Sequence, residues 1–260
     1  MGAPLASASA ALHLAAMTAD KDIAWIAGVG ARVGLGAALA RRFARAGFEV
    51  VVTGRSADKL DAVVREVVEA GGQASASVAD VSDERAIAEA AKHVSARGSL
   101  ALAVFNAGMM AVAPSLELSV EDFTRVWKVN TLGGFVFGRE ALRTMVPAGR
   151  GSLIFTGATA SLKARPPFAA FAASKAGLRS VAQSFAREFG PRGVHVAHVV
   201  IDGAIDGERV RSAAPERVAK LGPDGLLDID AIAEVYHHLH TQPRSAWTHE
   251  LDLRPFKEPF

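Results

Sequence analysis

The residues with the clearest chemical meaning share one face of a predicted helix, on which Lys175 follows Phe171 by four positions. Residues four apart are neighbours on the surface of an α-helix. Lys175 offers a charged hydrogen-bond donor, whereas Phe171 has no ionisable group and cannot act as an acid or a base. This face therefore carries a charged donor without an acid–base partner beside it.

A glycine-rich turn follows the apolar run at 23–27 and reads Gly28-Val-Gly30-Ala-Arg32-Val33-Gly34-Leu35-Gly36. The spacing Gly-x-Gly-x-x-Gly is not matched because of Val33, but a Gly-x-x-x-Gly-x-Gly spacing is kept. Glycines let the backbone turn sharply and approach a pyrophosphate that sits on helix N-terminal amides. The turn therefore predicts dinucleotide binding; the alternative is a turn that only packs a helix on a strand.

Two asparagines lie at positions with a chemical interpretation. Asn106-Ala107-Gly108 follows the apolar run at 100–105, and would lie at the carboxyl edge of a parallel sheet, where ligands bind. A plain turn is the alternative. Asn130 falls inside a predicted helix, although Asn is a poor helix former. Either a buried amide that bends the helix or a solvent-facing side chain would account for it.

Short apolar runs alternate with amphipathic stretches along the chain. Strands are expected at 23–27, 48–53, 73–78, 100–105, 151–155 and 194–201. Helices are expected after the glycine-rich turn up to about 46, and at 57–70, 83–96, 119–146 and 168–189. Such alternation with unbroken apolar strands is typical of a doubly wound parallel sheet covered on both faces. No linker divides the sequence, so we expect one Rossmann-like α/β domain over 21–260.

The composition narrows the function further. The 260 residues carry a net charge of +2, and the arginines are scattered, which argues against a nucleic-acid partner. The absence of cysteine excludes disulfides, thiolate catalysis and Cys-ligated metals, and is compatible with the cytoplasmic location that we expect. The histidines at 195, 198, 237, 238 and 240 lack the pattern of a metal triad, so no metal site is predicted.

The first 20 residues are expected to form a flexible extension, with Met17 as an alternative start of the chain. The apolar run at 5–17 is too short to span a bilayer and lacks the basic flank of a secretory signal. We therefore predict no membrane partner.

Over roughly residues 22–210, the order of these motifs resembles the short-chain dehydrogenase/reductase family. The match runs through the glycine-rich turn, Asp80-Val81, Asn106-Ala107-Gly108, Asn130, the strand at 151–155 and Lys175. Residues 155–161 and the tail at 242–255 resemble a divergent subgroup with Phe at the position of a catalytic Tyr. The resemblance implies an NAD(P)(H)-dependent oxidoreductase acting on an unknown small carbonyl or alcohol. It also implies a homodimer or homotetramer formed through the helices at 119–146 and 168–189.

The same resemblance assigns cofactor contacts. It places the turn at the pyrophosphate, Asp80 and Val81 at the adenine, the Asn-Ala-Gly on the ribose side, and Lys175 on the nicotinamide ribose. The implied cofactor-binding residues are Gly30, Arg32, Val33, Gly34, Leu35, Gly36, Arg55, Asp80, Val81, Asn106, Ala107, Gly108, Lys175, Gly203 and Ile205.

The end of the second strand bears on cofactor choice. NAD-preferring members usually carry an acid there for the ribose 2′-hydroxyl, but this chain has Arg55 and no acid. Together with Arg32 in the turn, this arginine suits a 2′-phosphate, so NADP(H) is favoured over NAD(H). The alternative is that Arg55 caps a helix or faces solvent.

The catalytic set implied by the resemblance is incomplete. Asn130 and Lys175 are present, whereas the Tyr position is Phe171 and the Ser position, thirteen residues earlier, is Ala158. The hydroxyl of Thr159 could substitute if the loop shifts by one residue. Asp202 and Asp206 stand where Pro and Thr are expected. They could bond a nicotinamide amide, supply a proton, or simply form a turn.

Three functional hypotheses follow from this pattern. The first is an oxidoreductase whose proton comes from water, Thr159, Asp202 or Asp206, because loss of an acid slows carbonyl reduction without forbidding it. The second is a non-catalytic dinucleotide-binding protein, such as a sensor or an oligomer partner. The third is a folded scaffold that has lost dinucleotide binding.

Overall fold

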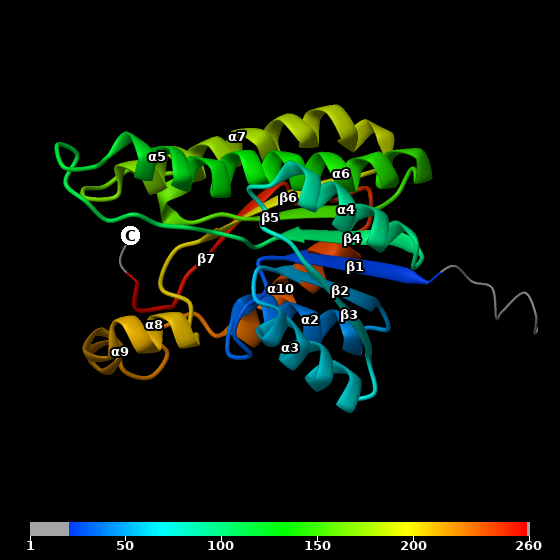
Figure 1. Cartoon of the computed structure of the whole chain (residues 1–260), viewed down its shortest axis with the longest axis horizontal. Helices are drawn as coiled ribbons and strands as arrows, with labels where there is room; N and C mark the ends of the chain where they lie inside the picture. The colour runs from blue at the N-terminus through cyan, green and yellow to red at the C-terminus, as the bar shows by residue number, and fades with distance from the viewer. Residues whose placement is uncertain (1–20, 259–260) are drawn as a thin grey trace, which may run out of the picture.

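The computed structural model describes residues 21–258 (Figure 1). The expected extension at 1–20, with Met17, lies outside the described residues. No helix within 21–258 combines the length and the apolar character needed to cross a bilayer.

A seven-stranded parallel sheet forms the centre of the structure, in the order β3-β2-β1-β4-β5-β6-β7. The order reverses between β1 and β4, which creates a topological switch point at their carboxyl ends. The strands are β1 (Asp22–Ala27), β2 (Glu49–Gly54), β3 (Gln73–Val78), β4 (Ser99–Phe105), β5 (Ser152–Thr156), β6 (His195–Ile201) and β7 (Glu250–Leu253). The predicted doubly wound parallel sheet is confirmed.

Helices cover both faces of the sheet in two layers (Figure 1). The helices α2, α3 and α10 pack on one face, and α4, α6 and α7 pack on the other. Their bounds are α2 (Leu35–Arg45), α3 (Ala57–Glu69), α4 (Glu84–Ser95), α5 (Val120–Trp127), α6 (Gly133–Ala148), α7 (Ala169–Phe189) and α10 (Ile229–Thr241). Two shorter helices, α8 (Glu208–Ala213) and α9 (Pro215–Leu221), lie between β6 and α10.

The strand β7 was not predicted from the sequence. It is only four residues long and contains two acidic residues, so it lacks the apolar run that marks the other strands. It is nevertheless parallel to β6, with His198 opposite Glu250 and Ile201 opposite Leu253. An edge strand needs burial on fewer sides than a central one, which permits this polar sequence.

The single helix predicted at 119–146 is wrong in two respects. The chain forms α5 and α6, joined by a π-helical turn at Lys128–Leu132 that contains Asn130. The helix α6 also continues past its expected end, because Pro147 lies inside its last turn and the helix ends at Ala148. A proline this close to the C-terminus removes one backbone donor without interrupting later turns.

The two layers contain different cores. Trp25 lies fully buried under α6, with its ring centroid 4.3 Å from that of Phe137, and its indole nitrogen donates to Thr53 Oγ1 at 2.9 Å. On the opposite face, Phe43 of α2 packs against Phe48 and the rings of α10. These cores hold the strands rigidly, so that their carboxyl ends present a fixed set of loops.

The turn after β1 makes one close approach that requires glycine. Gly28 has a φ of +87°, and a Cβ at this position would overlap the backbone nitrogen of Ala107 in the loop after β4. Gly47 provides a matched comparison, because it has a φ of +92° with no heavy atom within 4 Å of such a Cβ. The two positions share backbone strain and differ in steric contact.

We expect Gly28→Ala to lower the free energy of unfolding by about 3 kcal/mol or more, because strain and backbone overlap add. Gly47→Ala should cost only about 1 kcal/mol, the strain alone. Urea unfolding monitored by circular dichroism measures both. Equal losses would show that the contact with the loop after β4 does not constrain position 28.

Candidate active site

The glycine-rich turn lies at the carboxyl end of β1 and leads into α2. A Cβ at Gly30 would have no heavy atom within 4 Å, so the backbone there faces open space. Gly36 instead serves packing, since its Cβ would lie 2.9 Å from the Gly28 carbonyl oxygen. Gly34 precedes α2 and no side chain caps the helix, which leaves its first amides available to an anion.

Two other residues of the turn have structural contacts. Leu35 is only 5% exposed and packs in the core, so its backbone alone can face a ligand. Val33 is half exposed, and its carbonyl oxygen accepts a hydrogen bond from the Glu208 amide at 2.8 Å. This bond joins the turn to the start of α8.

The Asn106-Ala107-Gly108 segment lies against the turn. Asn106 Nδ2 donates to the Gly28 carbonyl oxygen at 3.2 Å, and Ala107 is buried beside it. A Cβ at Gly108 would lie 3.7 Å from Lys175 Nζ and 3.8 Å from Asn130 Oδ1. The structure thus brings the loops after β1 and β4 together with the two polar residues of the predicted catalytic set.

Asn130 is fully buried in the π-helical turn between α5 and α6. Its amide forms a pair of 2.8 Å bonds with the backbone of Met109, one accepted from the Met109 amide and one donated to the Met109 carbonyl. Its Nδ2 also donates to Ser174 Oγ at 2.7 Å. The side chain is therefore a buried amide that ties the loop after β4 to α7.

Lys175 is buried on α7, and its ammonium donates to the Thr156 carbonyl oxygen at the end of β5, at 2.8 Å. Burial lowers the pKa of Lys175 to about 8, and the positive charge of Arg209 contributes. Phe171 lies one turn earlier on α7 and is half-buried. This part of the site therefore contains a lysine that titrates near neutrality and an aromatic ring that does not titrate.

The loop after β5 carries Ala158 and Thr159. Thr159 Oγ1 donates to Asp202 Oδ1 at 2.6 Å, and the other carboxylate oxygen of Asp202 forms an ion pair with Arg254 of the tail. Ala158 has no polar side chain, so Thr159 provides the hydroxyl of this loop nearest the expected Ser position. The hydroxyl proton of Thr159 is therefore engaged in the hydrogen bond to the Asp202 carboxylate.

Asp202 and Asp206 have different partners in the loop after β6. Asp206 accepts hydrogen bonds from Arg211 of α8 at 2.6 and 2.8 Å, whereas Asp202 contacts Thr159 and Arg254. Gly203, between them, has a φ of +148°, and a Cβ there would lie 2.7 Å from Pro255 Cδ. Ile205 forms a bridge with Leu227 and packs partly against the core.

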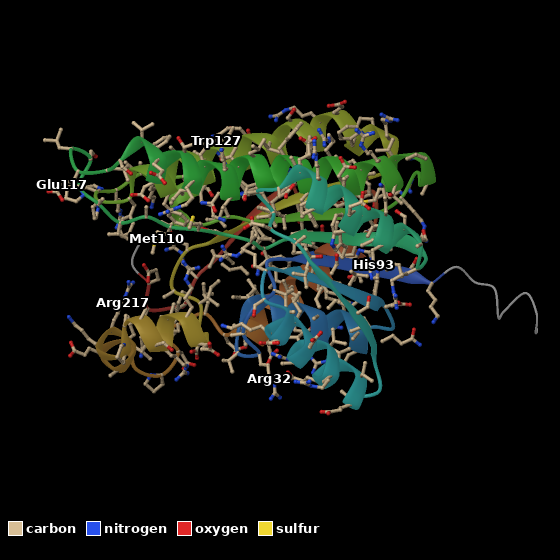
Figure 2. The ribbon with its side chains drawn as sticks, viewed as in Figure 1. Arg32, His93, Met110, Glu117, Trp127 and Arg217 are labelled. Atoms are coloured by element: carbon tan, nitrogen blue, oxygen red, sulfur yellow. The ribbon has the colours of Figure 1, made fainter. Side chains whose placement is uncertain are left out.

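A cavity of about 690 Å³ opens beside the glycine-rich turn. Its lining residues are Arg32, Val33, Arg41, Glu66, Glu208 and Ile229. Arg32 Nε and Arg41 Nη1 both contact Glu66, at 3.0 and 3.4 Å, so two guanidinium groups share one carboxylate. Figure 2 shows Arg32 projecting from the structure next to α2 and α3.

Arg55 follows β2 and is largely exposed, with its Nη1 3.9 Å from Asp80 Oδ2. Asp80 Oδ1 accepts hydrogen bonds from the amide and hydroxyl of Ser82, which fixes the turn after β3. Val81 is buried against Gly133 of α6. Arg55 therefore faces solvent and is not the N-cap of α3, which is Ser56.

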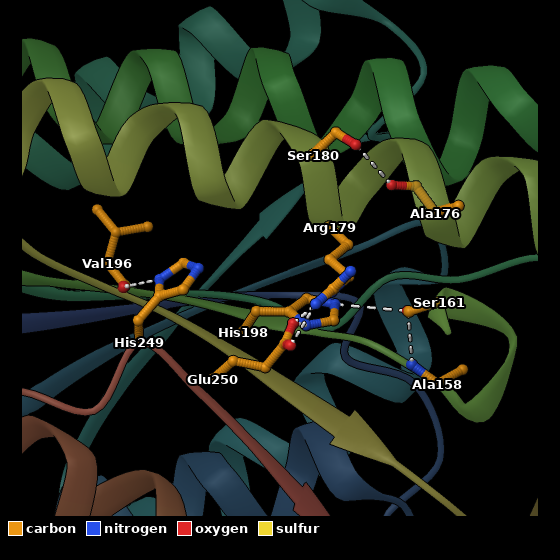
Figure 3. A network of polar contacts seen from close by, with 9 residues as sticks. All are labelled: Ala158, Ser161, Ala176, Arg179, Ser180, Val196, His198, His249 and Glu250. Carbon is orange, nitrogen blue, oxygen red and sulfur yellow. Dashed lines mark hydrogen bonds and ion pairs between the residues drawn. The ribbon is translucent and has the colours of Figure 1, made fainter. Parts of the chain in front are cut away.

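A polar network under the loop after β5 was missed by the sequence analysis. Arg179 Nε and Nη2 donate to the two carboxylate oxygens of Glu250, both at 2.6 Å, and Glu250 Oε2 lies 2.9 Å from His198 Nδ1 (Figure 3). His198 Nε2 in turn lies 3.4 Å from Ser161 Oγ. One signal was available: Arg179 follows Lys175 by four residues, on the same helix face as Phe171.

Two further histidines that the sequence analysis considered, His195 and His240, make structural contacts. His195 stacks on Trp247 with ring centroids 4.9 Å apart, and His240 Nδ1 lies 3.0 Å from Ser152 Oγ. His195 begins β6, and His240 of α10 contacts the first residue of β5, so both lie at the amino end of the sheet. Across residues 21–258, no three His, Asp or Glu side chains are grouped so that they could hold a metal ion.

Comparison with known proteins gives consistent matches. A family model described as short chain dehydrogenase matches residues 24–217. A glucose 1-dehydrogenase from Gluconobacter oxydans is 34% identical over 182 residues, which span 68% of this chain and 67% of that protein. The alignment thus covers about two thirds of this relative.

Solved structures agree with this comparison. A short-chain dehydrogenase from Rhodopseudomonas palustris is 37% identical, with a TM-score of 0.77 over 91% of this chain and 99% of the other. A metagenomic short-chain oxidoreductase in complex with NADP is 29% identical, with a TM-score of 0.76 over 90% of this chain and 96% of the other.

We expect Lys175→Met to stabilise the fold at pH 7. The folded-state pKa of about 8 lies below the ordinary value of 10.5, so the folded state holds the ammonium at a cost wherever both states are protonated. That cost, on the order of 3 kcal/mol, is fully present below pH 8 and declines as the pH rises to 10.5. Denaturant unfolding of both proteins at pH 7 and pH 10.5 measures it. A methionine variant that is less stable at pH 7 would contradict this account of the burial.

Proposed function

The chain belongs to the short-chain dehydrogenase/reductase family, and from that premise we propose that it transfers hydride between NADP(H) and an unidentified small carbonyl or alcohol. The preference for NADP(H) rests on two guanidinium groups, those of Arg32 and Arg55, at the end of the site where the adenosine would bind. Arg32 lines the cavity, Arg55 follows β2, and no acid ends that strand. A relative with NADP bound shares the fold and 29% of the sequence.

The residues present fit such a cofactor. Open space at Gly30, the uncapped amides at the start of α2 and the Arg32 cavity suit a pyrophosphate and a 2′-phosphate. Lys175 would hold the nicotinamide ribose, and Asn106 to Gly108 would lie along the same side. NADP(H), when bound, supplies the hydride chemistry, and the protein binds and orients it.

The proton must then come from a group other than a phenol or a serine. Phe171 and Ala158 carry no exchangeable proton, and the Thr159 proton is directed at Asp202, which is itself paired with Arg254. Asp206 is occupied by Arg211. We therefore propose that Lys175 Nζ is the proton source, with water as the route to the substrate. Its pKa of about 8 suits proton exchange near neutral pH.

The protein would act as a homo-oligomer in this proposal, through the outer side of α5 to α7. Val120, Phe123 and Trp127 are 83%, 38% and 40% exposed and share one face of α5 at helical spacing. Figure 2 shows Trp127 on the outer side of the helices, away from the sheet. A stripe of exposed apolar side chains favours burial against another copy of the chain, as a dimer or tetramer.

Cofactor preference is tested by calorimetric titration with NADPH and then NADH. We expect micromolar NADPH binding, weaker NADH binding, and about a tenfold loss of NADPH affinity in Arg55→Ser, because a charge-assisted contact is removed. Arg187→Ser, at the far end of α7, is the control and should change neither affinity. Equal affinities for both cofactors would overturn the NADP preference. No binding at millimolar concentration would leave only the scaffold hypothesis.

The altered active site is tested by the double variant Phe171→Tyr with Ala158→Ser. We expect NADPH-dependent reduction of an aromatic aldehyde to rise about 100-fold over the unmodified chain, because the variant adds an acid and a hydroxyl donor to the Asn130 and Lys175 already present. Ala158→Ser alone is the matched control and should gain much less. An unchanged rate in the double variant, with NADPH still bound, would favour the non-catalytic dinucleotide-binding hypothesis.

A further inference from the structure

A chain of hydrogen bonds connects the loop after β5 to α7 through the interior (Figure 3). It begins at the Ala158 amide, which donates to Ser161 Oγ at 3.1 Å, and continues to His198 on β6, Glu250 on β7 and Arg179 on α7. His198 is fully buried and Ser161 is 5% exposed. These two residues are therefore internal, whereas the side chains of Arg179 and Glu250 are 34% and 24% exposed, so the network runs from the interior towards the surface.

The direction of each bond follows from the charges. Burial lowers the pKa of His198 to about 4, because the effects of Lys175 and Arg179 add to desolvation and outweigh Glu250. The pKa of the Glu250 carboxyl is lowered by Arg179, so it remains ionised. A neutral imidazole beside a carboxylate donates through Nδ1, which leaves Nε2 as an acceptor for the Ser161 hydroxyl.

His198 also occupies space that a side chain at position 157 would need. A Cβ at Gly157 would overlap His198 Nε2 and lie 3.0 Å from the Val199 carbonyl oxygen. The Gly157 amide donates to that same oxygen at 2.7 Å. The imidazole therefore supports the loop backbone directly, at the residue between Thr156 and Ala158.

The same backbone presents the acceptor for Lys175. The Thr156 carbonyl belongs to the peptide group that it shares with Gly157, and it accepts the Lys175 ammonium at 2.8 Å. A movement of Gly157 would rotate that carbonyl. The proximity of the two groups is also evident in the effect of the Lys175 charge on the pKa of His198.

We infer that His198 is a positioning residue that holds the loop after β5 through Ser161 and Gly157, and so fixes the Thr156 carbonyl that orients Lys175. This inference deepens the proposed function, on which its consequence for turnover rests. Glu250 and Arg179 assist by fixing which imidazole nitrogen faces the loop. Ala158 and Thr159 remain in place beside the substrate region as a result.

Two amide variants separate the contacts of the ring. The Asn amide overlaps His Nδ1, so His198→Asn keeps the bond to Glu250 and loses the acceptor for Ser161. The Gln amide overlaps His Nε2, so His198→Gln keeps the acceptor for Ser161. We expect about a tenfold loss of kcat with little change in KM for His198→Asn, and near-normal kcat for His198→Gln.

A second measurement is independent of turnover. In the full-length protein with labelled lysine side chains, the NMR titration of Lys175 should have a midpoint near pH 8. In His198→Asn we expect the midpoint to fall by about half a pH unit, because the ammonium loses a fixed acceptor. Ser161→Ala should shift the Lys175 midpoint in the same direction. This variant replaces His198→Asn in the experiment if the asparagine variant does not fold.

His195→Asn is the matched control, since this buried histidine lies on the same strand and bonds Thr248 at the opposite end. It should lower the thermal midpoint without moving the Lys175 titration. The inference is overturned if Lys175 titrates alike in the wild type and His198→Asn, or if kcat follows the thermal midpoint across all variants. A titration shift in a protein without turnover would support the inference and remove the proposed function.

Discussion

The arrangement of the site depends on one buried ammonium group. Lys175 lies inside the protein with no carboxylate in ion-pair contact among the described residues, and the Thr156 carbonyl accepts one of its three protons. A buried charge is costly unless hydrogen bonds compensate for lost water, so the loops around it must be held accurately. Asn130 holds the loop after β4, and the β6 side chains hold the loop after β5.

The hydrogen bonds around the site are present although the side chains at two expected catalytic positions carry no polar group. The positions where relatives of the family are expected to carry a Ser and a Tyr hold Ala158 and Phe171, yet the backbone at both loops is fixed by several buried bonds. His198 fills the space next to Gly157, and Asp202 accepts a hydrogen bond from the Thr159 hydroxyl. Under the proposed function, proton supply is therefore the central question, because Phe171 and Ala158 carry no exchangeable side-chain proton.

Elements that depend on a local sequence pattern were predicted, whereas elements that depend on contacts between distant residues were not. The apolar runs of β1, β2, β4, β5 and β6 marked strands correctly because these strands are almost entirely buried, whereas β3 is an edge strand that is only partly buried. The π-helical turn between α5 and α6 escaped prediction, since its buried Asn130 bonds Met109, and a contact between residues 21 apart is not visible in a local sequence pattern. The strand β7 escaped because Glu250 and Asp252 hide its pattern, and only the pairing with β6 defines it. The residues of the glycine-rich turn lie together between β1 and α2, and the side chain of Leu35 packs in the core.

The sequence by itself determined the doubly wound sheet, the glycine turn and the absence of an ionisable group at position 171, because these depend on residue type and periodicity alone. Only the tertiary structure decided the roles of the remaining polar groups. It separated Asp202 from Asp206 and gave each a different arginine, and it placed His198, Glu250 and Arg179 from three elements in one network. The physical reason is that hydrogen-bond direction and burial depend on which elements meet in space, and residues 179, 198 and 250 are far apart along the chain.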